Sequence, residues 1–194
     1  MIVSAPTSKL YFTSDTHFFH RAMAYIRGFS SIDEMNATLI AGWNSTVPRD
    51  GVVIHLGDLS FGGTTNTVSL LGQLHGTIHL VRGNHDRGMS STVRKMFATT
   101  NDYLEVRATY GAGCGRDKIV CSHYSHRVWN QHHYGAWHLY GHSHGSLPGI
   151  GRSMDVGVDT NALRPYSFEK IRNILERQPI HTIDYHKGIS NGAS

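Results

Sequence analysis

A chain of 194 residues with 39% hydrophobic and 16% charged residues is long enough for one domain with a substantial core and too short for us to expect two. Its net charge of +4 comes from scattered basic residues with no run of five or more, which favours an anionic ligand but does not indicate a nucleic-acid-binding module. No apolar run reaches about 18 residues and residues 1–6 lack the pattern of a signal peptide, so we expect no membrane span and a cytoplasmic protein.

The first half of the chain alternates strands and helices, a pattern typical of the α/β class. Residues 9–13 predict a strand, residues 52–56 a second, buried one formed by an apolar run, and residues 78–81 a third. A helix near residues 65–75 is expected to turn Val68, Leu71 and Leu74 inward. Another helix begins at the capping box Ser31-Ile32-Asp33-Glu34 and has one apolar face, formed by Ile32, Met35, Leu39, Ile40 and Trp43.

The second half is richer in strands. A short helix is expected near residues 91–98, and Ser167 can cap a last helix that turns Phe168, Ile171, Ile174 and Leu175 inward. Strands are expected near residues 103–108, 117–122, 136–140 and 154–158. No repeat or linker divides the chain, so we predict a single domain over residues 1–194 with a frayed tail at about 188–194.

Short polar motifs follow the predicted strands and contain five of the 15 histidines. Each motif carries a carboxylate, an amide oxygen or an imidazole, which are ligands for divalent metals. Because the carboxyl ends of strands in an α/β sheet converge on one edge, we expect the motifs to meet in one cleft that holds two adjacent metal ions. The motifs are Asp15-Thr16-His17, Gly57-Asp58, Gly83-Asn84-His85-Asp86, Ser122-His123 and Gly141-His142-Ser143-His144.

The spacing within the motifs suits such a site. Asp15 and His17 are two residues apart, so in an extended segment they face the same way, as do His142 and His144. A glycine precedes Asp58, Asn84 and His142 and lets the backbone approach the site closely. The two oxygens of one carboxylate can bridge two cations that lie roughly 3.5–4 Å apart.

The five motifs, in this order over residues 15–144, resemble those of the calcineurin-like metallophosphoesterase superfamily: D-x-H, G-D, G-N-H-[DE], a single His and G-H-x-H. The segments Phe18-Phe19-His20, Trp43-Asn44 and Ser122-His123-Tyr124 further resemble small bacterial and phage phosphoesterases of this superfamily. The resemblance implies an α/β fold in which a two-sheet β-sandwich is flanked by helices.

The resemblance also implies a role for each motif residue. His85 would protonate the leaving oxygen or hydrogen-bond the phosphoryl group, and Asp86 would orient His85 through its ring N–H. Asp58 would bridge the two metals. One metal would be held by Asp15, His17 and His144, and the second by Asn84, His123 and His142. Nitrogen and oxygen ligands without thiolates favour two divalent ions such as Mn, Fe, Zn or Ni.

The chain departs from the protein Ser/Thr phosphatases of this superfamily. Those enzymes carry G-D-x-x-D-R-G, whereas Gly57-Asp58 is followed here by Leu59-Ser60-Phe61-Gly62 without the Arg. They also carry G-N-H-E, whereas this chain has Asp86. Both departures argue against a protein phosphatase, and the phosphate clamp of that branch is missing.

Several residues near the motifs have more than one interpretation. Candidates for the missing clamp and for substrate binding are His20, Arg87 and Arg127, although His20 could instead cap the next helix. Trp129 either packs against the rest of the protein or forms part of the wall of the substrate site. Asn44 is expected to end its helix, with a place in the site as the alternative. Outside the motifs, we expect structural roles for His55 and His79, and an exposed loop for His132 and His133, with a substrate contact as the alternative.

The sequence therefore predicts a dinuclear metal-dependent phosphoesterase that hydrolyses phosphodiesters or nucleotides by direct attack of a metal-bridging hydroxide. A phosphomonoesterase acting on a nucleotide or small metabolite is the alternative, because it would share the metal centre. A non-catalytic scaffold is less favoured, since such relatives typically lose a ligand and this chain retains all of them. The expected partner is a small phosphate ester or nucleotide.

Overall fold

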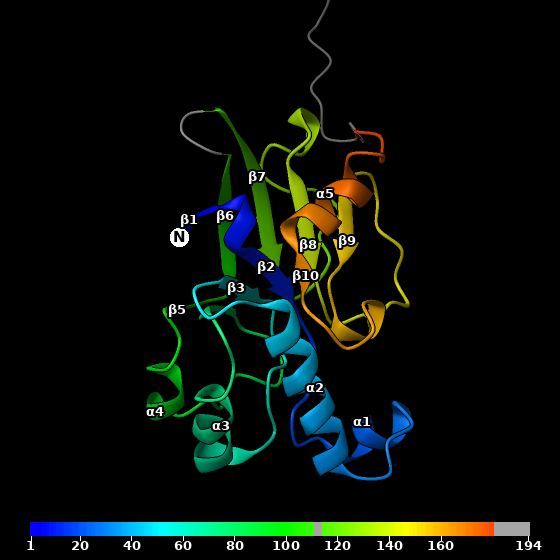
Figure 1. Cartoon of the computed structure of the whole chain (residues 1–194). Coiled ribbons are helices and arrows are strands. Elements are labelled where there is room, and N and C mark those ends of the chain that lie inside the picture. The colour runs from blue at the N-terminus through cyan, green and yellow to red at the C-terminus, as the bar shows by residue number, and fades with distance from the viewer. Residues whose placement is uncertain (111–113, 181–194) are drawn as a thin grey trace, which may run out of the picture.

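Two five-stranded sheets and their flanking helices make up the computed structural model, which describes residues 1–110 and 114–180 (Figure 1). The predicted frayed tail at 188–194 lies outside the described residues. The first sheet has the order β1 (Ile2–Pro6), β6 (Tyr103–Tyr110), β7 (Cys114–Ser122), β8 (Trp137–Tyr140) and β9 (Ser153–Asp155). The second has the order β10 (Tyr166–Ser167), β2 (Leu10–Thr13), β3 (Val52–His55), β4 (Thr77–Val81) and β5 (Thr99–Asn101). The two-sheet α/β architecture expected from the sequence is confirmed.

Parallel pairing sets the direction of the strands that carry the motifs. β2, β3, β4 and β5 are parallel neighbours in the second sheet, and β7, β8 and β9 are parallel neighbours in the first. The carboxyl ends within each set therefore lie at one edge of its sheet. The sequence did not predict β1, β5 or β10, because none of these short segments has an apolar run or a clear alternation.

Four helices follow the predicted order: α2 (Ile32–Thr46), α3 (Gly63–Leu71), α4 (Ser91–Arg94) and α5 (Phe168–Leu175). No residue range was predicted for α1 (Arg21–Ile26), the short helix after His20, and the 3-10 turns are η1 (Thr7–Lys9), η2 (His132–Tyr134) and η3 (Val158–Thr160). Ser31 caps α2 by accepting a hydrogen bond from the Glu34 N–H, and Ser167 caps α5 in the same way. The inward position predicted for Ile174 is wrong: Phe168, Ile171 and Leu175 form the buried stripe of α5, and Ile174 is exposed beside it. Within the described part of the chain, no helix is long and apolar enough to cross a membrane.

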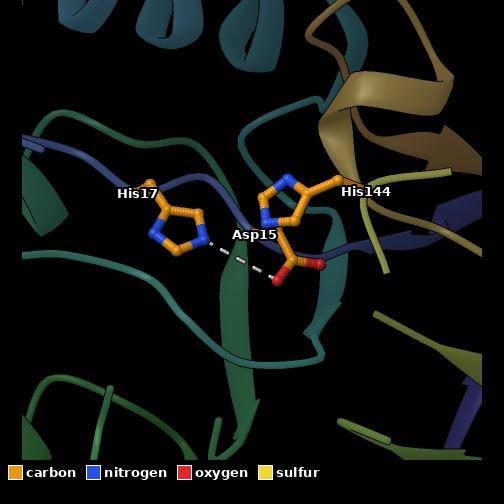
Figure 2. Close-up of side chains that lie close together, drawn as sticks. All are labelled: Asp15, His17 and His144. Carbon is orange, nitrogen blue, oxygen red and sulfur yellow. Dashed lines mark ion pairs between the residues drawn. The ribbon is translucent and has the colours of Figure 1, made fainter. Parts of the chain in front are cut away.

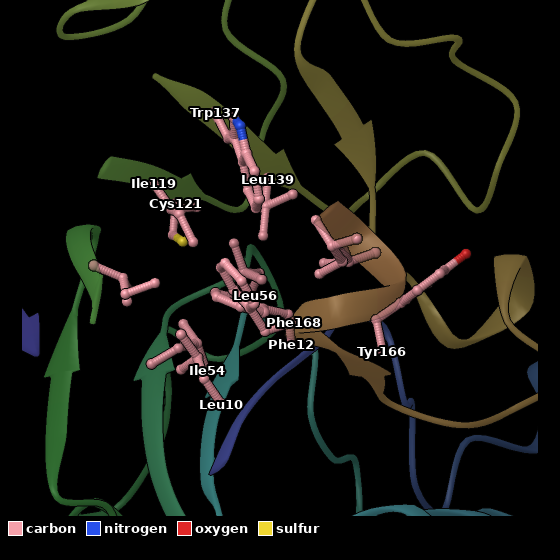
Figure 3. Packing of buried hydrophobic residues seen from close by; sticks show 14 of the residues in the cluster. Leu10, Phe12, Ile54, Leu56, Ile119, Cys121, Trp137, Leu139, Tyr166 and Phe168 are labelled. Atoms are coloured by element: carbon pink, nitrogen blue, oxygen red, sulfur yellow. The ribbon is translucent and has the colours of Figure 1, made fainter. Parts of the chain in front are cut away.

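The second sheet is covered on both faces. Leu10, Phe12 and Ile54 pack against Leu139 of the first sheet and Phe168 of α5 (Figure 3). On the opposite face, a second cluster packs strand residues against α2 and α3, with members such as Val53, Leu80, Met35, Leu39, Trp43 and Leu70. Because strand side chains alternate, adjacent Val53 and Ile54 are both fully buried yet belong to different cores, which explains the continuous apolar run.

Candidate metal centre

The polar motifs lie at the carboxyl ends of five strands. The second sheet supplies the motifs that follow β2, β3 and β4, and the first sheet supplies those at the ends of β7 and β8. A hydrogen bond joins the two sheets at this edge, from Nδ1 of His123 to the carbonyl oxygen of Leu56, 2.7 Å away. Side chains that are far apart in sequence therefore meet between the sheets.

Two groups of side chains could each hold a metal ion. Asp15, His17 and His144 form one group (Figure 2), and Asp58, His123 and His142 form the other. In each group, one ligand atom from every residue lies within 4.8 Å of the others. The structure thus brings together the side chains expected to bind metal, and Asn84 joins the second group through Oδ1, which lies 2.9 Å from Nε2 of His123.

Asp58 lies between the two groups. Its Oδ2 is 3.7 Å from Nε2 of His17 in the first group, and its Oδ1 is 3.6 Å from Nε2 of His123 in its own. The two oxygens of one carboxylate therefore face different groups, which is the arrangement that a bridging ligand requires.

The buried polar atoms of the first group fit a cation. Oδ1 of Asp15 and both ring nitrogens of His17 are buried without a hydrogen-bond partner. Such atoms are costly unless something satisfies them. Burial raises the pKa of Asp15 to about 6, and burial followed by the charge of His144 lowers the pKa of His17 to about 3. A neutral imidazole beside a carboxylate with one unpartnered oxygen suits a divalent ion.

The backbone that presents these ligands is left-handed, not extended as we predicted. Positive φ angles occur at Asp15, His17, Asp58, His142 and His144, with values between 47° and 68°. In the Asp15/His17 pair and in the His142/His144 pair, both residues have this left-handed backbone conformation. Non-glycine residues seldom adopt this conformation, and where it persists the surrounding structure enforces it, most often at functional sites.

The glycines of the motifs allow the close approach that we expected. A Cβ added to Gly57 would lie 2.5 Å from the backbone nitrogen of Gly83, and one added to Gly83 would overlap the carboxylate of Asp58. A Cβ on Gly141 would overlap the hydroxyl of Ser14. Any side chain at these positions would push the ligand loops apart.

One outer contact of the site was not predicted from the sequence. Nδ1 of His144 lies 2.7 Å from Oδ2 of Asp159, and because a carboxylate only accepts, the ring donates this hydrogen bond. The bond raises the pKa of His144. Arg27 forms two hydrogen bonds with the same carboxylate and two more with the carbonyl oxygens of Asp15 and Thr16. Neither Arg27 nor Asp159 stands in a motif, so no sequence signal marked them.

Asp86 has partners other than the one we expected. Its carboxylate accepts hydrogen bonds from the backbone N–H groups of Asp58, Leu59 and Gly83, at 2.8, 3.2 and 2.8 Å. Both of its oxygens thus bind the backbone of two ligand loops and do not face the ring of His85. The side chain of His85 is 47% exposed, with Nε2 3.9 Å from Oδ2 of Asp58.

The buried ring of His55 contacts two of the loops that carry the candidate ligands. The N–H of Gly57 donates to Nδ1 of His55, and Nε2 lies 3.1 Å from the hydroxyl of Thr16, which donates to the carbonyl oxygen of Leu59. The structural role predicted for this buried residue is confirmed. His79 likewise makes a structural contact, with the hydroxyl of Thr99.

The two predicted substrate contacts differ in position. His20 caps α1, because its Nδ1 accepts a hydrogen bond from the Met23 N–H, and its ring also lies 5.5 Å from that of His17. The cap and the cleft position, posed as alternatives, thus occur together. Arg127 is exposed, and the cations that line the 220 Å³ pocket beside Asn84 and His123 are Arg82 and Arg87.

Three other residues with open interpretations are structural. Asn44 does not end its helix as expected, because α2 continues to Thr46. Its side chain instead binds the carbonyl oxygen of Gln73 and the N–H of His75 in the turn before β4, outside the site. The ring N–H of buried Trp129 donates to the carbonyl oxygen of Ala136. The exposed position predicted for His132 is wrong: its ring is 3.9 Å from that of Trp129 and the residue is 2% exposed.

Known proteins are similar to this chain in sequence or in fold. Residues 8–170 match the family described as calcineurin-like phosphoesterase. The gene 66 protein of Mycobacterium phage L5 is 28% identical, over 90% of this chain and all of its own length. An uncharacterized protein of Methanocaldococcus jannaschii is 31% identical, over 87% of this chain and 92% of its own. The crystal structure of a protein of unknown function from Aquifex aeolicus has a similar fold, with a TM-score of 0.64 and 19% identity over 85% of this chain and 98% of its own.

Proposed function

The chain belongs to the calcineurin-like phosphoesterase family, a family of metal-dependent phosphoester hydrolases, and from this premise we propose that it hydrolyses phosphodiesters or nucleotides with two divalent ions. The observation that carries the proposal is the position of Asp58, whose two oxygens face two separate groups of ligands. A site for a single ion would not need both groups.

We assign the ligands as the geometry groups them. Asp15, His17 and His144 would hold one ion, Asn84, His123 and His142 would hold the other, and Asp58 would serve both. When bound, two divalent ions would supply an activated water and charge stabilisation for direct hydrolysis, without a covalent enzyme intermediate. The hydrogen bonds of His123 and His144 through Nδ1 leave Nε2 of each ring for the metal.

His85 is suited to proton transfer rather than to metal binding. Its side chain is nearly half exposed beside Asp58, and it belongs to neither ligand group. We assign it the donation of a proton to the leaving oxygen. Asp86 keeps the loops of Asp58 and Gly83 in place through its three backbone hydrogen bonds, so its contribution to the reaction is positional.

The surroundings of the site favour a diester. When the protein phosphatase motif G-D-x-x-D-R-G is aligned on Gly57-Asp58, Gly62 stands at the position of the Arg. A Cβ on Gly62 would overlap the ring of Phe19, so no cationic side chain fits there. A monoester dianion needs such a clamp more than a diester with a single negative charge, which the two metals can hold.

The test uses metal-stripped protein with Mn, Ni, Zn or Mg added singly, and compares bis(p-nitrophenyl) phosphate with p-nitrophenyl phosphate. We expect at least one metal to restore hydrolysis, with the higher kcat/KM for the diester. A folded protein that hydrolyses neither ester with any metal would contradict the proposal. A preference for the monoester that disappears in Arg87→Ala or Arg127→Ala would overturn the diester assignment and identify the clamp.

A further inference from the structure

A groove of about 1060 Å³ lies next to the metal centre and has no part in the roles assigned so far. Its walls come from α1, from the start of α2 and from the segment that leads into α3. Four aromatic side chains line it, those of Phe19, Tyr25, Phe29 and Phe61. The groove thus offers several ring faces within reach of the cleft.

Phe61 connects the groove to the metal centre. Its ring is 5.5 Å from the ring of the metal-site residue His17, nearly parallel to it, and 4.9 Å from the ring of His85. The residue is 38% exposed although it stands among these rings. A molecule whose phosphoryl group sits between the two ligand groups would therefore place its adjoining substituent on or beside Phe61.

The chemistry of the walls indicates the kind of substituent. Aromatic side chains stack on planar rings, and nucleobases are recognised in this way with little dependence on sequence. Polar groups accompany the rings: exposed Arg21 comes from α1 and exposed Asn66 from α3, so donors and an acceptor are available for the edge of a base. The volume is ample for a nucleoside.

The position next to the expected phosphate site also favours recognition of an aromatic substituent. The position at which protein phosphatases carry a cationic clamp is Gly62, and the space that a side chain would take is filled by the ring of Phe19, one of the groove's walls. An aromatic surface thus replaces a charged one directly beside the cleft. This arrangement selects for what is attached to the phosphate rather than for the charge of the phosphate.

We propose that this groove binds the base of a nucleoside phosphate whose phosphoryl group lies at the metal centre, and that Phe61 stacks on the base. The inference rests on the proposed function and deepens it, because it names a nucleotide diester as the substrate class.

The first experiment isolates the contribution of the base. Thymidine 5′-monophosphate and 2-deoxyribose 5-phosphate share a sugar and a phosphate, and each is tested as an inhibitor of bis(p-nitrophenyl) phosphate hydrolysis. We expect the nucleotide to inhibit about 5- to 150-fold more tightly, the range that base–aromatic stacking gives. Phe61→Leu should bring the ratio of the two inhibition constants, sugar phosphate over nucleotide, close to one. Phe61→Tyr should keep this ratio at its wild-type value. Tyr134→Leu, a change of an exposed aromatic residue in η2, is the control and should leave the ratio unchanged.

The second experiment separates the groove from catalysis. Binding of the same two compounds to metal-free protein is measured by calorimetry, with sedimentation to record the oligomeric state. Tighter binding of the nucleotide that depends on Phe61 supports the groove even if no ester is hydrolysed, in which case only the proposed function fails. Equal inhibition by both compounds in an active enzyme, an unchanged ratio in Phe61→Leu, or a dimer that the same substitution dissociates would overturn the inference while the phosphoesterase proposal stands.

Discussion

Asp159 accepts a 2.7 Å hydrogen bond from Nδ1 of His144 and is held from its other side by Arg27, whose Nε lies 2.7 Å from Oδ1. The bond fixes the ring so that Nε2 is left for a metal. Arg27 lies at the end of α1 and also donates to the carbonyl oxygens of Asp15 and Thr16. A single side chain thus braces ligands from both sheets.

From this contact we expect Asp159→Asn to weaken metal binding about 10- to 100-fold, the usual effect of losing a carboxylate that orients a histidine ligand. Metal affinity is measured by competition with a chelator of known affinity. Asp50→Asn, which removes an exposed carboxylate paired with Lys9, serves as the control and should bind metal normally. Equal affinities of the Asp159 variant and the wild type would show that the contact does not orient the ligand.

Asp58→Asn should lower the metal content and abolish hydrolysis. The substitution keeps the size of the side chain but removes the charge from the residue that faces both ligand groups. Metal content by mass spectrometry and turnover of bis(p-nitrophenyl) phosphate are the measurements, with Asp50→Asn again as the control. Two ions per chain together with normal turnover would refute the bridging role.

His85→Asn should retain two ions per chain and slow turnover, because the ring lies outside both ligand groups. General acid catalysis contributes about 10²–10⁴-fold. The loss should be largest for diesters with poor leaving groups, which need the proton, and smaller for p-nitrophenyl esters. A loss of the same size for both kinds of ester would argue for a different role, such as a hydrogen bond to the phosphoryl group.

His138 should make the metal-free protein less stable in mild acid. It is fully buried, its Nδ1 lies 3.0 Å from the carbonyl oxygen of Val120, and its Nε2 accepts from the His126 N–H, so an added proton has no place. Burial lowers its pKa from 6.5 to about 4. The stability from this residue is therefore complete above pH 6.5 and is lost as the pH falls from 6.5 towards 4, by up to roughly 1.4 kcal/mol per pH unit.

The measurement is urea unfolding in the presence of a chelator at pH 7.5 and 5.0, together with the NMR signal of the His138 ring. We expect a lower free energy of unfolding at pH 5.0 and a ring that is still neutral there. A His138 signal that titrates near 6.5 in the folded protein would contradict this explanation, whatever the urea data show.

The sequence allowed the convergence of the candidate ligands to be predicted because strand ends and motif order are local features. Asp15 and Asp58 each stand within three residues of the end of an apolar run, and the parallel sheet brings such ends together. Glycine positions could be predicted for the same reason, since close approach follows from the absence of a side chain.

The contacts around the ligands could not be predicted in this way. Arg27 and Asp159 are 132 residues apart, and nothing in either segment indicates the other. Asp86 was expected to orient its neighbour His85, but the folded chain turns its carboxylate toward the backbone of a loop from another strand. The left-handed backbone at the candidate ligands could not be predicted either, because Asp and His rarely adopt this conformation unless tertiary contacts enforce it.

The division of the ligands between the two sheets has a mechanical consequence. Asp15 and His17 come from one sheet and His144 from the other, and the second group is divided in the same way. An ion bound in either group would therefore act as a cross-link between the two layers of the sandwich. Metal binding would therefore raise the free energy of unfolding, by about 2.7 kcal/mol when the free metal concentration is 100 times the dissociation constant. The edge that carries the candidate metal centre would then also stabilise the contact between the two sheets.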